Sequence, residues 1–162
     1  MAIKDLISHI YSDDMAEVFV SLILHNLEGR DYLLDRGKIV DFGCGSAKIL
    51  HLLKERYPKI EAIGVDLDPF KRYDDVRYVT ADMRSTGIHS NSANMIISVN
   101  VADLLLDKED INADQIFQET NRILIPRGVY IPCELSRDKL ITPFVKAGYK
   151  QFGCFKCQEK PS

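Results

Sequence analysis

The run KIVDFGCGSAKIL, residues 38–50, places one acidic side chain and two glycines in a short turn. Asp41 precedes Gly43 by two positions, and Gly45 follows at the same interval. Glycines allow a sharp turn and let a ligand come close to the backbone. The residues after the turn have a helical pattern, and the amides at a helix N-terminus favour a carboxylate or a phosphate. The run therefore predicts a ligand-binding turn at the end of a strand.

The spacing of the motif decides between classes of ligand. A dinucleotide fingerprint, G-x-G-x-x-G, needs a third glycine where Lys48 stands, so the spacing disfavours NAD. A second acid, Asp66, follows Gly45 by 21 residues, close to the roughly 20 expected of ribose-binding acids. The alternative interpretation is a bare α/β scaffold, in which Asp41 caps the turn and Asp66 belongs to a turn before Pro69.

The elements that must position these residues alternate between strand and helix. Short apolar runs predict strands at 38–42, 60–66, 76–80, 94–99 and 128–132, and residues 149–158 predict a last strand or a tight hairpin. Helical spacing predicts helices at 13–31, 46–56, 113–124 and 137–148. The alternation predicts a doubly wound, mostly parallel α/β sheet, which binds ligands at the carboxyl ends of its strands.

In their order, the motifs resemble those of class I S-adenosylmethionine-dependent methyltransferases. IVDFGCGSA is similar to the family's first motif, hydrophobic-hydrophobic-D-x-G-x-G-x-G, with Ala47 in place of the last glycine. IGVDLDP, VTADM and NMIISVNVADLLL resemble the ends of the family's second, third and fourth strands. NRILIPRGVYI resembles the R-x-L-x-P-G-G helix exit, with Arg127 replacing a glycine. The resemblance covers about residues 37–153.

The resemblance implies an enzyme that uses S-adenosylmethionine to methylate an unidentified acceptor by in-line transfer. Asp66 would accept hydrogen bonds from both ribose hydroxyls, and Asp82 would accept one from the adenine amine. Asn100 would orient the nucleophile and Asp103 would act as a base, unless both simply cap the segment VADLLLD. No metal is expected. The predicted cofactor-binding residues are Asp41, Gly43, Cys44, Gly45, Asp66, Leu67, Asp82, Met83 and Ser98.

The sequence also departs from the family's pattern. The segments 69–75 and 84–92 are too short or too loop-like for the usual second and third helices, and the C-terminus is short for the usual antiparallel pair of strands. A sheet with one thin flank would expose apolar surface for a second copy or a protein partner. These departures support the alternative function, a non-catalytic methyltransferase-fold subunit that partners another protein.

The length and charge are those of an ordinary globular domain. A chain of 162 residues with 46% hydrophobic residues predicts one domain over 1–162, with residues 1–36 as a helical region packed on it. The net charge of −3 gives no overall attraction to nucleic acid. Residues 136–162 carry six Lys or Arg against two Asp or Glu, so nucleic acid stays open as a partner.

The location follows from the hydropathy and the cysteines. No stretch approaches the length of a transmembrane helix, and the acidic N-terminus does not resemble a signal peptide. Four cysteines suggest reduced thiols in the cytoplasm. Cys154 and Cys157 form a C-x-x-C, which is interpreted as structural because no further ligand lies beside it and it falls in a strand-like run.

Overall fold

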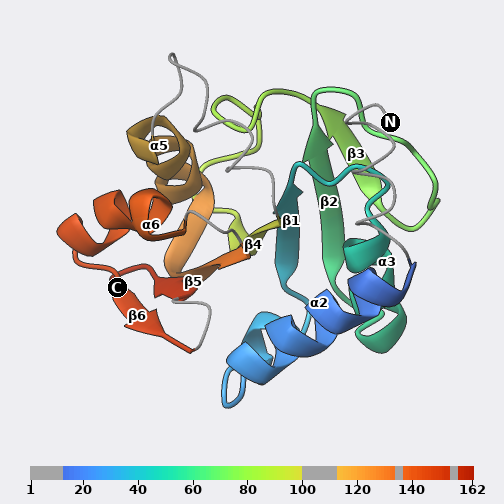
Figure 1. The fold of residues 1–162 in the computed structure, drawn as a ribbon, viewed down its shortest axis with the longest axis horizontal. Coiled ribbons are helices and arrows are strands. Elements are labelled where there is room, and N and C mark those ends of the chain that lie inside the picture. Colours follow the sequence, from blue (N-terminus) through green and yellow to red (C-terminus); the bar gives the residue numbers. More distant parts are fainter. Residues whose placement is uncertain (1–12, 100–112, 134–136, 154–156) are drawn as a thin grey trace.

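The computed structural model describes residues 13–99, 113–133, 137–153 and 157–162. Within these residues, seven strands form one sheet in the order β3-β2-β1-β4-β5-β7-β6 (Figure 1). Strands β1 to β5 run parallel, and β7 is antiparallel to its neighbours β5 and β6. The strands are β1 (Lys38–Phe42), β2 (Glu61–Asp66), β3 (Arg77–Thr80), β4 (Ala93–Val99), β5 (Leu124–Cys133), β6 (Lys150–Phe152) and β7 (Cys157–Glu159). This topology confirms the predicted mostly parallel α/β sheet.

Helices cover both faces of the sheet. The α2 and α3 helices lie on one face and α5 and α6 on the other (Figure 1). Their bounds are α2 (Asp13–Asn26), α3 (Lys48–Arg56), α5 (Ala113–Ile123) and α6 (Arg137–Lys146), with a 3-10 turn η1 (Asp31–Leu33). Among the described residues, none of the helices combines the length and apolar character that crossing a bilayer requires.

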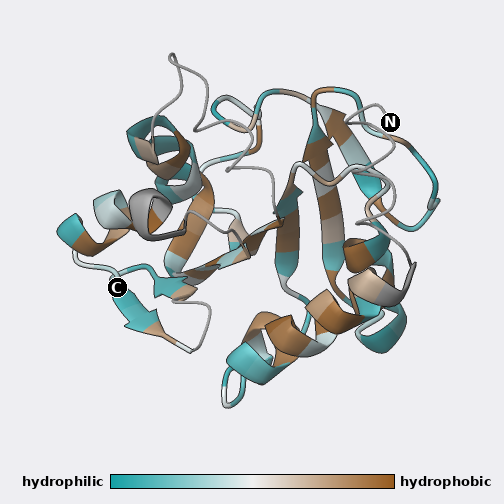
Figure 2. Ribbon diagram, viewed as in Figure 1, coloured by the Kyte–Doolittle hydropathy of each residue, from teal (hydrophilic) through white to brown (hydrophobic). Residues whose placement is uncertain are grey.

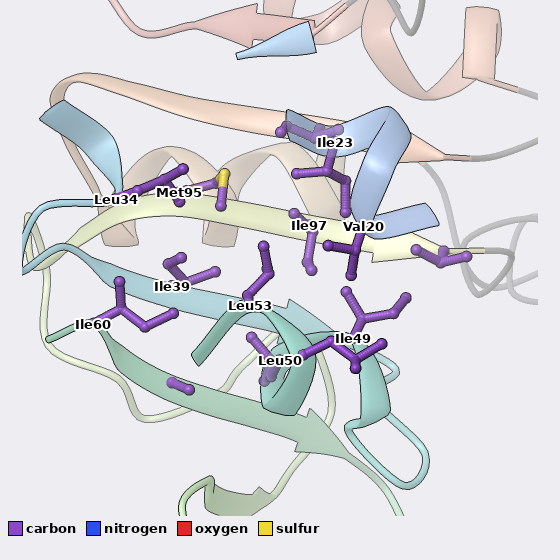
Figure 3. Close-up of a cluster of buried hydrophobic side chains, with 14 of the residues drawn as sticks. Val20, Ile23, Leu34, Ile39, Ile49, Leu50, Leu53, Ile60, Met95 and Ile97 are labelled. Atoms are coloured by element: carbon purple, nitrogen blue, oxygen red, sulfur yellow. The ribbon is translucent and has the colours of Figure 1, made fainter. Parts of the chain in front are cut away.

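Two hydrophobic clusters sandwich the sheet because strand side chains alternate between its faces. Ile39 of β1 belongs to the cluster under α2 and α3, whereas its neighbour Val40 belongs to the cluster under α5 and α6. Figure 3 shows the first cluster, to which α2 contributes Val20, α3 contributes Leu50 and β4 contributes Ile97. Hydrophobic residues run through the central strands and along α2 (Figure 2). The paired clusters hold the strand ends, and hence the turn after β1, in fixed positions.

Two crossover connections contain no helix. Residues 67–76, between β2 and β3, and residues 81–92, between β3 and β4, are described throughout and form loops and turns. This confirms the prediction that these segments are too short or too loop-like for the family's usual second and third helices. Strand β3 is consequently half-exposed on both faces at one edge of the sheet.

Side chains replace the missing second helix in holding the β2–β3 loop. The ring of Tyr73 stacks on His51 of α3, with centroids 4.1 Å apart, and Asp75 lies 3.1 Å from Nδ1 of the same histidine. The hydroxyl of Tyr78 accepts hydrogen bonds from the backbone amides at 72 and 73 and donates to the carbonyl of Ser46. The loop is therefore fixed against both α3 and the glycine turn.

Several boundaries differ from prediction. Helix α2 ends at Asn26 rather than 31, and α6 ends at Lys146 rather than 148. Helix α3 begins at Lys48 rather than 46, because Ala47 has left-handed backbone. Strand β5 begins at Leu124 rather than 128, because Leu124 pairs with Ala93 before an irregularity shifts the register. The C-terminal region is short, as expected: β6 and β7 form an antiparallel pair of three residues each, which agrees with the hairpin alternative predicted for residues 149–158.

The two positions where the sequence departs from the glycines of the resembled motifs are both left-handed. Ala47 has φ 61° and Arg127 has φ 62°. The backbone thus keeps the conformation that glycine adopts without steric cost, although the residues have changed.

We expect Arg127→Gly to be more stable than Arg127→Ala by about 1 kcal/mol, because only glycine relieves the left-handed strain. The guanidinium of Arg127 has its central carbon 5.7 Å from the centroid of the Tyr32 ring, and both variants remove this contact. The difference between them therefore measures the cost of the left-handed backbone conformation alone. Denaturant unfolding of the two variants measures the difference. Equal stability, or the reverse order, would contradict a strained backbone at this position.

Candidate functional site

The order of strands reverses next to β1, whose neighbours are β2 on one side and β4 on the other. Such a reversal opens a crevice at the carboxyl ends of the strands. The glycine turn leaves β1 at this edge, beside the end of β2, because Phe42 is in register with Val65. Asp66 in turn is in register with Thr80 of β3. The three predicted ligand-binding segments therefore meet at one edge of the sheet (Figure 1).

The glycine turn is held by backbone hydrogen bonds. The amides of Gly43 and Cys44 both donate to the carbonyl of Val65, at 2.8 and 3.1 Å, and the carbonyl of Gly45 accepts from the amide of Phe70 at 3.0 Å. Gly43 and Gly45 have φ of 72° and 51°, which favours glycine. A Cβ built on Gly45 would meet no described atom within 4 Å. The turn is therefore rigid but open above Gly45, as a ligand cradle requires.

Asp66 joins the end of β2 to this turn. Its Oδ2 accepts a hydrogen bond from the amide of Gly45 at 2.9 Å, and its Oδ1 accepts one from the amide of Asp68 at 3.1 Å. A carboxylate offers about two acceptor sites on each oxygen. Since each oxygen accepts one hydrogen bond from the described residues, the carboxylate keeps capacity for two hydroxyl donors.

A small hollow lies between the ends of β1, β2 and β3, and we call it the β1–β2 hollow. Its volume is about 70 Å³, so it holds only part of a nucleoside and the remainder would lie over the open glycine turn. Leu67 at its rim is 65% exposed, whereas Met83 is buried. Five of the nine predicted cofactor-binding residues line it. The lining residues are Gly43, Val65, Asp66, Leu67, Ala81, Asp82 and Met83.

Asp82 is paired with a residue that the sequence did not single out. The guanidinium of Arg84 donates from Nε to Oδ1 at 2.9 Å and from Nη2 to Oδ2 at 2.6 Å, and the Arg84 amide also donates to Oδ1 at 2.8 Å. These hydrogen bonds hold the pKa of Asp82 below its ordinary value, so the carboxylate is ionised at neutral pH. The only signal in the sequence was an arginine two positions after the acid.

Four predicted residues do not line the β1–β2 hollow, and one of them, Gly45, belongs to the open turn described above. Asp41 is buried within β1. The Cys44 sulfur lies 2.6 Å from where a Cβ on Gly64 would stand, so the thiol packs against β2. Burial, with the nearby charges of Asp41 and Asp66, raises the pKa of this thiol far above its usual range, and it stays neutral. Ser98 is fully buried, with its hydroxyl 2.8 Å from that of Tyr130.

The two catalytic candidates, Asn100 and Asp103, lie outside the described residues. Their predicted roles in orienting and deprotonating an acceptor stay predictions.

The donors and acceptors at this edge match an adenosyl compound that bears an amino-acid end. Asp66 offers acceptors for ribose hydroxyls, and Asp82 offers an anionic acceptor for an exocyclic amine. Helix α3 starts at the glycine turn without a side-chain cap, so its first amides suit a carboxylate. The residues present therefore fit the cofactor that the motifs imply.

Comparison with known proteins agrees with this fit. A family model described as a methyltransferase domain matches residues 40–131. No curated protein matches the chain by sequence.

Solved structures of methyltransferases resemble the fold. A Methanococcus maripaludis protein assigned as an S-adenosyl-L-methionine-dependent methyltransferase has 16% identity and a TM-score of 0.58, with 94% of each chain covered. A Galdieria sulphuraria protein assigned as a sarcosine dimethylglycine methyltransferase has 18% identity and a TM-score of 0.55, with 74% of this chain and 45% of that one covered. Haemonchus contortus phosphoethanolamine N-methyltransferase 2 has 17% identity and a TM-score of 0.52, with 76% and 33% covered. The chain thus spans less than half of the last two.

Proposed function

The chain belongs to the methyltransferase domain family, and from this premise we propose that it binds S-adenosylmethionine and transfers the methyl group to an acceptor. The observation that carries the proposal is the β1–β2 hollow, where acids from the ends of β2 and β3 meet the open glycine turn. At 16–18% identity, the similarity to the solved structures concerns the fold, so no acceptor is carried over from them.

S-adenosylmethionine, when bound, supplies a methyl group on a positively charged sulfur. Asp66 would hold the ribose and Asp82 the adenine amine, while the turn at Gly43 and Gly45 and the first amides of α3 would hold the amino-acid end. The chain's contribution to an in-line displacement is alignment, because holding the reactants in line removes much of the entropic barrier. Cys44 takes no part as a nucleophile, since its thiol is buried and neutral.

We expect S-adenosylhomocysteine to bind with a dissociation constant in the micromolar range, about −8 kcal/mol. NAD is expected not to compete, because Lys48 occupies the position of the third dinucleotide glycine. Calorimetric titration with each compound measures both affinities. Tight binding of NAD with no binding of the adenosyl compound would reject the proposal.

A second candidate function is a non-catalytic subunit that binds the cofactor and partners another protein or a second copy. It is supported by strand β3, which is half-exposed at the sheet edge because both flanking connections lack helices. Incubating the protein and labelled cofactor with cell extract separates the two functions. Label that appears in any small-molecule, RNA or protein fraction supports the enzyme, and its absence from all of them supports the subunit.

A cytoplasmic location is also part of the proposal. It is supported by Cys44, which is a free and buried thiol. Free thiols of this kind persist in reducing compartments.

A further inference from the structure

Asp82 stands between two hollows. On one side it lines the β1–β2 hollow, together with Asp66 and Met83. On the other side it lines a second hollow of about 380 Å³ against α5, which we call the α5 hollow. The α5 hollow is lined by Asp82, Arg84, Ser85, Gln115 and Gln118. Asp82 is the residue that the two linings share.

Arg84 approaches Asp82 from the side of the α5 hollow. It lines that hollow and is not part of the lining of the β1–β2 hollow. Its guanidinium makes the two-pronged contact with the carboxylate, at 2.9 and 2.6 Å, and its backbone amide adds a third hydrogen bond at 2.8 Å. A planar fork of this kind fixes the plane of a carboxylate in a way that a lysine ammonium does not.

The hydrogen bonds leave an asymmetric carboxylate. Oδ1 accepts two of them, from Nε and from the amide of Arg84, which fills its two acceptor sites. Among the described residues, Oδ2 accepts a hydrogen bond from Nη2 of Arg84, which leaves one acceptor site on that oxygen. An ionised carboxylate has no hydrogen to donate, so this last site recognises a donor and repels an acceptor.

We propose that Arg84 is a positioning residue that sets the base specificity of the cofactor site, by holding Asp82 as a fixed, donor-selective acceptor. Adenine presents an amino group at C6, which donates. Hypoxanthine presents a carbonyl oxygen at the same position. This oxygen can only accept hydrogen bonds, so the carboxylate repels it. This inference rests on the proposed binding of an adenosyl cofactor and adds the residue that makes the site discriminate between bases.

The test compares S-adenosylhomocysteine with S-inosylhomocysteine, which differ at this position of the base. Calorimetry gives the affinity of each compound for the wild-type protein, Arg84→Met and Arg84→Lys. In Arg84→Met the preference for the adenosyl compound is expected to fall about tenfold, because the carboxylate loses its fixed orientation. Arg84→Lys is expected to recover only part of the preference, since it restores the charge without the fork.

Arg77→Met is the matched control, because it removes the same side chain and charge at the start of β3, and Arg77 lines neither hollow. Its guanidinium is exposed and lies 4.0 Å from Glu61. The preference should be unchanged in this variant, and a loss as large as in Arg84→Met would show a general effect of charge and overturn the inference. An unchanged preference in Arg84→Met would overturn the inference alone. Failure of the wild-type protein to bind the adenosyl compound would reject the proposed function, and the inference with it.

Discussion

Replacing Glu119 with Ala is expected to lower the free energy of unfolding by about 3 kcal/mol. The Glu119 side chain is buried, and its carboxylate accepts hydrogen bonds from the amide and the hydroxyl of Thr86, both at 2.7 Å. Arg122 donates to the same carboxylate from Nε and Nη2, both at 2.7 Å. Thr86 is itself buried, so the variant leaves its amide and hydroxyl without this acceptor. Denaturant unfolding measures the loss.

The expected effect is large because hydrogen bonds to this carboxylate hold a connection that contains no helix. The β3–β4 connection has none, and Glu119 is the side chain through which α5 holds Thr86 of that connection. Glu17→Ala is the matched control, since Glu17 pairs with Arg56 at 2.8 Å while their side chains are 49% and 42% exposed. In Glu17→Ala the free energy of unfolding should fall by less than about 1 kcal/mol. Similar small losses in the two variants would show that Glu119 does not fasten the loop.

The same carboxylate makes part of the stability depend on pH. Burial on its own would raise the pKa of Glu119, but the hydrogen bonds from Arg122 and Thr86 outweigh it and hold that pKa below its ordinary value. A lowered pKa in the folded state means that the stabilisation is complete above the unfolded pKa and is lost as the pH falls through the folded one. Glu119→Ala should therefore lose less stability on acidification than the wild-type protein does.

The sequence was sufficient for the framework of the site. Alternating apolar strands and helices predicted the parallel sheet, and counting the residues after Asp68 and Met83 predicted the curtailed helices. The spacing from Gly45 predicted that Asp66 is a ribose-binding acid, and the structure brings its carboxylate to 2.9 Å from the Gly45 amide. These features could be predicted because they depend on local restrictions of the backbone, namely the periodicity of hydrophobic residues, the residue types in turns and the length of each connection.

Pairs of side chains from separate segments could not be predicted in this way. Glu119 contacts Thr86, which lies 33 residues earlier in the chain, and no local sequence pattern predicts this pair. Ser98 is a different case, because strand alternation places it on the same face as Ile96, which belongs to the α5 and α6 cluster. Applying that alternation would have directed its side chain toward Tyr130 in the core rather than toward a ligand.

Replacing Asp66 with Ala is expected to weaken the binding of S-adenosylhomocysteine by about a hundredfold, through the loss of two charge-assisted hydrogen bonds to the ribose. The carboxylate also accepts a hydrogen bond from the amide of Gly45, so the variant releases the turn over which the ligand would lie. Calorimetry gives the affinity, and denaturant unfolding of the same variant shows whether the fold is intact.

Two further variants separate the acid's role in binding from its role in the turn. Asp66→Asn keeps an acceptor for the Gly45 amide but loses the charge, so its affinity should lie between those of the wild-type protein and Asp66→Ala. Asp68→Ala removes an exposed carboxylate two positions away, while its amide still donates to Asp66. It should bind within about threefold of the wild-type protein, because a lone exposed charge contributes little. Normal binding by Asp66→Ala together with weak binding by Asp68→Ala would move the ribose acid to position 68, since either carboxylate could reach past the end of β2.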